Sequence, residues 1–227
     1  MSSAQEIARE TARILLDTQS VLFNIDPPFT YTSGRKGPVY IDCRRLISFP
    51  KERKILMDFA AQNIRANAKD VDVIAGGETA GIPYAAFIAD RLEKPMIYIR
   101  KKPKGVGRNA QIEGQIDPGQ RALICEDLQN YGNSVKVFVD ALRAADTIVD
   151  TVFVLFTYGH ASSKKFMEDE GLKLLALCDW RAVIALAREE KRFEEKVLKS
   201  VEDFLADPVA WSVAHGGKGE DAAGVAA

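Results

Sequence analysis

The sequence predicts an α/β fold, in which a central and largely parallel β-sheet is flanked by helices and carries a small N-terminal cap. From residue 51 onward, short apolar runs typical of buried strands alternate with longer segments of helical apolar spacing. The first 45 residues break this rhythm, because they combine one helical stripe with glycine-containing turns. We therefore expect a cap at 1–45, a core at 46–210 and a disordered tail at 211–227.

The individual elements follow from local patterns along the chain. Residues 4–18 carry an apolar stripe of helical spacing, and 29–43 alternate around two glycine turns, which predicts a strand, a turn and a second strand. Further helices are expected at 51–66, 82–92, 135–144 and 162–170 and in segments up to 205. Strands are expected at 71–75, 96–99, 122–125, 151–156 and 172–178.

Composition points to a cytoplasmic, soluble protein. The formal net charge is −1, so no bulk attraction to nucleic acid or to a membrane is expected. The three cysteines show no paired spacing, which is typical of free thiols in a reducing compartment. No apolar run approaches the roughly 20 residues of a membrane span, and no signal peptide is expected from the polar N-terminal sequence.

The most informative stretch is 122–134. Four mostly apolar residues run into Glu126 and Asp127, a short polar loop follows, and a helical pattern then begins. A loop that enters a helix presents free backbone N–H groups, which suit a phosphate. Carboxylates at the carboxyl end of a parallel strand lie where open α/β sheets bind ligands. The stretch therefore predicts a phosphorylated sugar beside a divalent cation, although two exposed acids at a strand end would give the same pattern.

Three further loops offer anion-binding chemistry. The glycine-rich turn at 76–81 joins a strand to a helix. Its backbone amides suit a diphosphate, and the alternative is an ordinary turn between a strand and a helix. Residues 100–108 carry five cations and flanking glycines. This pattern is typical of a mobile lid that closes over a diphosphate, and equally of an ordinary solvated loop. The polar turn at 30–38 suits a small anion or is a plain hairpin turn.

Four segments in chain order carry a resemblance to a known family: the cap turn FTYTSGRKGPVYID, the loop GGETAGIPYA, the basic segment RKKPKGVGRNAQIEG and the segment ICEDLQNYGNS. Over residues 5–210 the sequence resembles orotate phosphoribosyltransferase, a type I phosphoribosyltransferase. The resemblance implies transfer of phosphoribosyl from phosphoribosyl diphosphate (PRPP) to orotate, which gives orotidine 5′-monophosphate and diphosphate in pyrimidine synthesis. It also implies Mg²⁺ as cofactor and a homodimer in which each lid reaches the partner's site.

The resemblance also assigns roles to residues. The catalytic candidates are Lys104, Arg100, Asp127 and Glu126. The PRPP-binding candidates are Lys101, Glu78, Thr79, Ala80, Gly81, Leu128, Gln129, Asn130, Tyr131, Gly132, Asn133 and Ser134. The orotate-binding candidates are Ser33, Gly34, Arg35, Lys36, Tyr40 and Asn130. No direct protein ligand to Mg²⁺ is expected, since PRPP would hold the ion, with water between it and the two carboxylates.

The loop at 129–133 departs from the family pattern. Asn130 replaces a threonine, Asn133 replaces a glycine, and Tyr131 is bulky for a loop that wraps a phosphate. Two alternatives therefore stay open at the level of sequence. One is a PRPP-binding, non-catalytic or regulatory relative, and the other is a phosphoribosyltransferase for another base.

Overall fold

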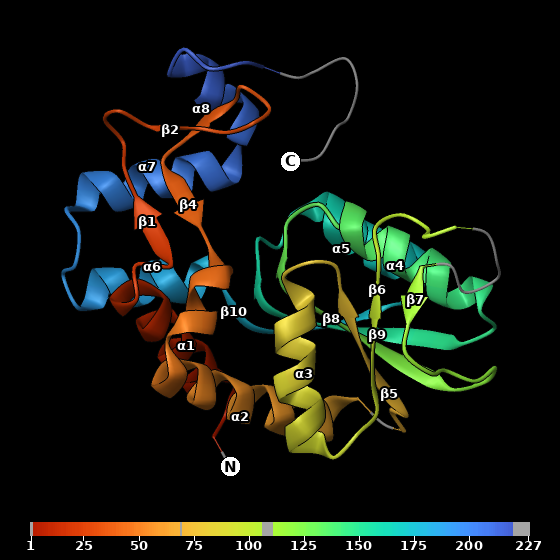
Figure 1. Ribbon diagram of the computed structural model, residues 1–227. Coiled ribbons are helices and arrows are strands. Elements are labelled where there is room, and N and C mark those ends of the chain that lie inside the picture. The colour runs from red at the N-terminus through yellow and green to blue at the C-terminus, as the bar shows by residue number, and fades with distance from the viewer. Residues whose placement is uncertain (1, 69, 106–110, 220–227) are drawn as a thin grey trace.

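The computed structural model describes residues 2–68, 70–105 and 111–219 (Figure 1). Among these residues, six strands form a central sheet in the order β10-β9-β8-β5-β6-β7, and only β7 runs antiparallel. The strands are β5 (Val73–Gly77), β6 (Met96–Ile99), β7 (Ile112–Glu113), β8 (Arg121–Gln129), β9 (Ile148–Thr157) and β10 (Lys173–Asp179). The predicted α/β fold with a largely parallel sheet is confirmed.

Helices cover both faces of this sheet. α1 (Ala4–Asp17), α2 (Pro50–Asn67) and α3 (Gly81–Leu92) pack on one face, whereas α4 (Asn133–Ala144) and α5 (Ala161–Asp169) pack on the other. Alternation along β8 serves both layers: Leu123 and Cys125 join the core under the first three helices, and Ala122 and Ile124 join the core under α4. No helix among the described residues is both long and apolar enough to span a membrane.

The cap is built from both ends of the chain. Near the N-terminus, β1 (Val21–Phe23) pairs with β4 (Val39–Ile41), and β2 (Phe29–Thr30) pairs with β3 (Lys36–Gly37). The 3₁₀ helix η1 (Cys43–Ser48) then leads into α2. After β10, the last strand of the sheet, the chain returns to the cap through three helices, α6 (Trp180–Glu189), α7 (Glu195–Ala206) and α8 (Pro208–Ala214), and α8 contacts β3. We call β1–β4 with α7 and α8 the hood.

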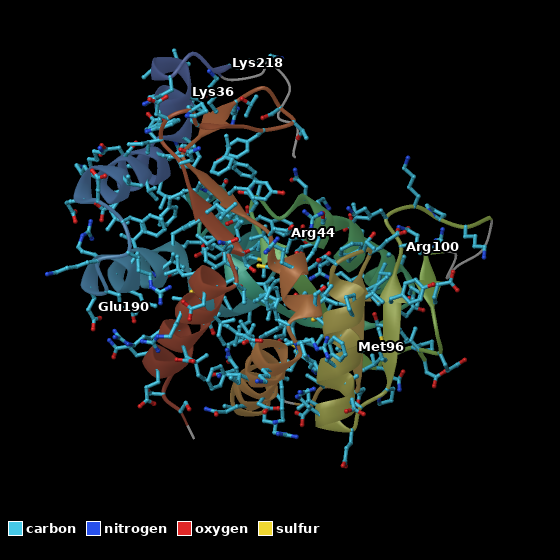
Figure 2. All side chains as sticks on the ribbon, turned by 60° about the vertical axis from the view of Figure 1, so that its left-hand side comes forward. Lys36, Arg44, Met96, Arg100, Glu190 and Lys218 are labelled. Carbon is cyan, nitrogen blue, oxygen red and sulfur yellow. The ribbon has the colours of Figure 1, made fainter. Side chains whose placement is uncertain are left out.

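Two features differ from the expected organisation. α1, expected in the cap, packs against α6 and β10 of the core, because its stripe of Ile7, Ala12 and Leu15 is buried there. Of the tail expected at 211–227, residues 211–214 belong to α8 and 215–219 make hydrogen bonds to the hood, and Figure 2 shows Lys218 next to Lys36 of β3. The remainder of that tail, 220–227, lies outside the described residues.

Candidate active site

Two adjoining cavities open at the carboxyl ends of β5, β8 and β9, the edge where parallel sheets bind ligands. The larger, which we call the polar cavity, has a volume of about 390 Å³. The smaller, the aromatic cavity, has a volume of about 150 Å³. Ile41, Asn130 and Tyr131 line both, so the two cavities form one continuous site.

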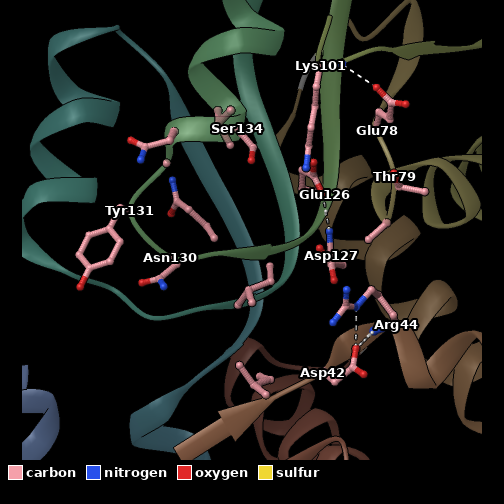
Figure 3. A pocket seen from close by; sticks show the side chains of 17 residues that line it. Asp42, Arg44, Glu78, Thr79, Lys101, Glu126, Asp127, Asn130, Tyr131 and Ser134 are labelled. Atoms are coloured by element: carbon pink, nitrogen blue, oxygen red, sulfur yellow. Dashed lines mark hydrogen bonds and ion pairs between the residues drawn. The ribbon is translucent and has the colours of Figure 1, made fainter. Parts of the chain in front are cut away.

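The polar cavity gathers nearly all the residues predicted to bind PRPP. It is lined by Glu78, Thr79 and Ala80, by Lys101, and by Leu128, Gln129, Asn130, Tyr131, Gly132, Asn133 and Ser134, together with Glu126 and Asp127. The sequence analysis missed Asp42 and Arg44, which come from the start of η1. The Arg44 Nε donates to Asp42 Oδ1 at 2.8 Å, which holds this cation at the rim (Figure 3).

The acidic pair lies on the cavity wall, inside β8 rather than at its end. Glu126 is only 6% exposed, and burial together with the charge of Asp127 raises its pKa to about 9. Burial also raises the pKa of Asp127, which the nearby Arg44 counteracts. Lys101 extends toward Glu126 in Figure 3 and lowers its pKa in part. The pair is therefore poised to accept a cation or hydroxyl donors in place of a proton.

The polar loop after β8 ends at a helix N-terminus. Gly132 has φ 92°, a left-handed conformation that favours glycine, and α4 begins at the next residue. The bend therefore falls at Gly132, and Asn133 adopts ordinary helical geometry as the first residue of α4. Gln129 Nε2 and Asn130 Oδ1 are buried without a hydrogen-bond partner among the described residues. Gln129 Nε2 and the helix N-terminus therefore offer hydrogen-bond donors to an anionic ligand, whereas Asn130 Oδ1 offers an acceptor to a donor group of a ligand.

The glycine turn between β5 and α3 needs its small residues for packing. A Cβ on Gly81 would overlap the carbonyl oxygen of Cys125, and one on Gly77 would overlap Glu126 and Phe138. Both glycines therefore let this turn approach β8 closely. Gly81, predicted to bind PRPP, is buried in this contact, whereas Glu78, Thr79 and Ala80 face the polar cavity.

The cations of the basic lid point to different places in this structure. The backbone N–H of Lys101 donates to Glu78 Oε2 at 2.7 Å, which ties the start of the lid to the glycine turn. The guanidinium of Arg100 lies 3.6 Å from the carboxylate of Glu113 on β7, and Lys104 is exposed. Among the described residues, therefore, only Lys101 of the predicted lid cations lines the polar cavity. Residues 106–110 of the lid lie outside the described residues.

The aromatic cavity contains much of the predicted orotate side. Ser33, Arg35, Tyr40 and Asn130 line it, whereas Gly34 and Lys36 face the C-terminal segment instead. The other lining residues, which the sequence analysis did not assign to the base, are Tyr31, Ile41, Tyr131, Tyr158, His160, Phe204 and Pro208.

His160 is the centre of an aromatic stack in this cavity. Its ring lies 4.7 Å from that of Tyr131, with 7° between the planes, and 5.4 Å from that of Tyr158. Burial lowers the pKa of His160, which favours the neutral ring. The bulk of Tyr131 is thus used in stacking at the junction of the two cavities. The sequence analysis gave His160 no role, because its main stacking partner, Tyr131, follows a different strand.

The family described as "Phosphoribosyl transferase domain" matches residues 48–184, which carry the sheet and most of the polar cavity. The match defines the class of the chain as a phosphoribosyltransferase. The orotate phosphoribosyltransferase of Agrobacterium fabrum (strain C58) is 51% identical over 217 residues, 94% of either chain. Among solved structures, orotate phosphoribosyltransferase from Aeropyrum pernix superposes with a TM-score of 0.67 at 27% identity, covering 81% of this chain and 99% of that one.

UMP synthase of Leishmania donovani superposes with a TM-score of 0.75 at 29% identity over 88% of this chain, which spans 42% of that longer chain. The chain belongs to the orotate phosphoribosyltransferase family. This membership agrees with the order of loops around the two cavities.

Proposed function

We propose that this protein transfers phosphoribosyl from PRPP to orotate in pyrimidine synthesis, giving orotidine 5′-monophosphate and diphosphate. One observation carries the proposal: a polar cavity with an acidic pair and a helix N-terminus adjoins an aromatic cavity that contains Arg35. The first has the chemistry of a sugar phosphate site, and the second has that of a flat, anionic base. The relatives from Agrobacterium fabrum and Aeropyrum pernix bear the same activity in their names.

In the polar cavity, we place the 5-phosphate of PRPP at the N-terminus of α4, within reach of the loop from Asn130 to Ser134. The ribose hydroxyls then face Glu126 and Asp127. Glu78, Thr79 and Ala80 receive the diphosphate, with Lys101 opposite the acidic pair. This arrangement puts the anomeric carbon toward the aromatic cavity.

In the aromatic cavity, we place orotate against the stacked rings of Tyr131 and His160. Arg35 supplies the positive charge for the carboxylate of orotate. Asn130, with its unpartnered Oδ1, lies between the two sites and accepts a hydrogen bond from the base. Ser33 and Tyr40 complete the polar part of the wall.

The reaction breaks the C–O bond between the anomeric carbon and the diphosphate through an oxocarbenium-like state. Two needs dominate this chemistry: stabilisation of the leaving group and exclusion of water. Lys101 already faces the polar cavity. We propose that Arg100 and Lys104 join it when the lid closes over bound PRPP, and that Lys104 contributes most to turnover.

The acidic pair fits a hydrated Mg²⁺ that enters with PRPP. Glu126 and Asp127 are adjacent carboxylates with raised pKa values, a donor set that gains from a nearby cation. Among the described residues no group of three or more His, Cys, Asp or Glu side chains that could hold a metal ion is found. We propose that PRPP itself holds most of the coordination of the ion, with water between it and the two carboxylates. When bound, Mg²⁺ supplies charge neutralisation for the diphosphate.

We further propose a homodimer in the cytoplasm, with the lid of each chain reaching the partner's site. The exposed position of Lys104 supports a lid that works outside its own cavity. The buried free thiols of Cys43, Cys125 and Cys178 support a reducing compartment. Sedimentation of the purified protein with and without PRPP measures the oligomeric state.

The test of the activity is the loss of orotate absorbance on addition of PRPP and Mg²⁺ to purified protein. We expect Mg²⁺-dependent turnover that Asp127→Asn lowers sharply. The matched control is Asp140→Asn, a carboxylate exposed on α4 and paired with Lys136 at 2.9 Å, which should retain turnover. PRPP binding without turnover would favour a regulatory relative, and turnover only with another base would reassign the aromatic cavity.

A further inference from the structure

The C-terminal segment 212–219 makes a close set of hydrogen bonds to the turn 33–36. The Ser212 Oγ accepts from the backbone N–H of Lys36 at 3.0 Å and donates to the carbonyl of Lys218 at 2.7 Å. The backbone N–H of Lys218 donates to the carbonyl of Gly34 at 3.1 Å. Two backbone groups, one from each end of the chain, thus meet at one hydroxyl, and a third bond between the two backbones lies beside them. Figure 2 labels Lys36 and Lys218 at this contact.

This contact is tightly packed. Ser212 is fully buried. A Cβ on Gly217 would lie 2.7 Å from the backbone nitrogen of Lys36, and a Cβ on Gly34 would lie 2.8 Å from Cδ of Lys218. The absence of side chains at the two glycines therefore allows the two backbones to lie against each other.

The segment is itself anchored to the body of the protein. The Trp211 indole stacks on His215 at 3.6 Å, packs edge-on against Phe204 at 5.6 Å and donates through Nε1 to Ser200 Oγ at 3.1 Å. These contacts fix α8 on α7. In turn, Arg188 of α6 pairs with Glu195 at the start of α7 at 2.8 Å, so a continuous chain of helices links the core to the turn.

The same segment contacts the cation of the aromatic cavity. The Arg35 Nε donates to the carbonyl of Gly219 at 3.3 Å. Arg35 contributes the only guanidinium among the described residues that line this cavity. Phe204 of α7 and Pro208 of α8 form part of the same wall. The carbonyl therefore helps to orient the charge that faces the base.

We propose that the segment 212–219, with Ser212 as its positioning residue, holds the turn that carries Ser33 and Arg35 and thereby sets the affinity for the base. The inference rests on the proposed function. Ser212 does not line either cavity among the described residues and acts through the turn alone. The groups that we assign to PRPP lie on the β8–α4 loop and the glycine turn, and the turn 33–36 contributes none of them, so the effect should be confined to orotate.

The test uses two variants and one control of the full protein. Ser212→Ala removes the hydroxyl that joins Lys36 and Lys218. A chain ending at Gly216 removes the partners of Gly34 and Arg35, and a chain ending at Asp221 keeps every described contact and serves as control. For each we measure KM for orotate, KM for PRPP, kcat, and amide hydrogen exchange of the peptide that contains Lys36.

We expect KM for orotate to rise on the order of tenfold in both variants, the cost of leaving a buried hydrogen-bonding group unpaired. KM for PRPP should stay within about twofold, and exchange at Lys36 should accelerate. Three results would overturn the inference: faster exchange with unchanged KM for orotate, unchanged exchange, or a parallel rise of both KM values. No turnover in the full chain would instead overturn the proposed function, and the inference with it. An active full chain with an inactive Asp221 control would place the effect beyond residue 221 and overturn the inference alone.

Discussion

The burial of Glu126 makes a quantitative prediction about stability. Its pKa rises from 4.5 to about 9 because the side chain is buried beside the charge of Asp127. Between these pH values the folded chain carries a proton on Glu126 that the unfolded chain has lost. The folded state therefore binds more protons, and the free energy of unfolding decreases as the pH rises across this range. Glu126→Gln, which cannot ionise, should remove this pH dependence.

The size of the effect follows from the pKa. At pH 8, a rise of the Glu126 pKa from 4.5 to about 9 lowers the free energy of unfolding by roughly 5 kcal/mol relative to a side chain that cannot ionise. The charge of Asp127 raises the pKa of Glu126 and that of Lys101 lowers it, so the three groups share this free energy. We therefore expect Glu126→Gln alone to stabilise the substrate-free protein by about 2 kcal/mol at pH 8. The amide oxygen can still accept from the Asp127 N–H, which now donates to Glu126 Oε2 at 3.2 Å.

Urea unfolding at pH 5, 6.5 and 8 measures this gain. For a chain of this size, 2 kcal/mol shifts the midpoint at pH 8 by about 1 M, and the shift should shrink toward zero at pH 5. Asp140→Asn, exposed on α4, should change stability by less than about 0.5 kcal/mol at every pH. A Glu126→Gln protein that is less stable than the parent at pH 8, or equally shifted at all three pH values, would refute the reasoning.

Three more predictions address the site. Lys104→Ala should lower turnover by at least about 100-fold with an unchanged melting temperature, whereas Lys102→Ala should stay within a fewfold; equal rates for both variants would sink the lid assignment. Gly81→Ala should cost about 2 kcal/mol or more in urea unfolding, because the new Cβ overlaps the carbonyl oxygen of Cys125; an unchanged midpoint would contradict this packing. Excess EDTA should abolish orotate consumption and added Mg²⁺ should restore it, while turnover that survives EDTA would exclude a need for the ion.

Local patterns in the sequence were sufficient for most of the core. The strand at 96–99 is observed with both predicted ends, and the glycine turn at 76–81 lies where expected. The acidic pair was expected at the end of its strand, but β8 continues to Gln129. Leu128 and Gln129 pair with Phe156 and Thr157 of β9, so the length of the neighbouring strand decides where β8 ends. Polar composition alone does not reveal that partner.

The hood depends on contacts between residues that are distant in sequence. Ser212 and Lys36 are 176 positions apart, and neither position carries a local pattern that indicates the other. The aromatic cavity has the same origin, because His160 follows β9 whereas Tyr131 follows β8. An isolated histidine therefore gave no reason to expect a stack.

The hood also sets an order of events during synthesis on the ribosome. Arg35 emerges early, but the carbonyl that orients it belongs to Gly219, 184 positions later. At a translation rate of about 5–20 residues per second, roughly 10–40 s separate the two. The last sheet strand, β10, ends at Asp179, 40 positions before Gly219, so the sheet and the polar cavity are complete in the nascent chain roughly 2–8 s before the wall of the aromatic cavity. Base recognition is the last part of the site to mature, so chains interrupted late in translation would retain a sugar phosphate site without a finished place for the acceptor.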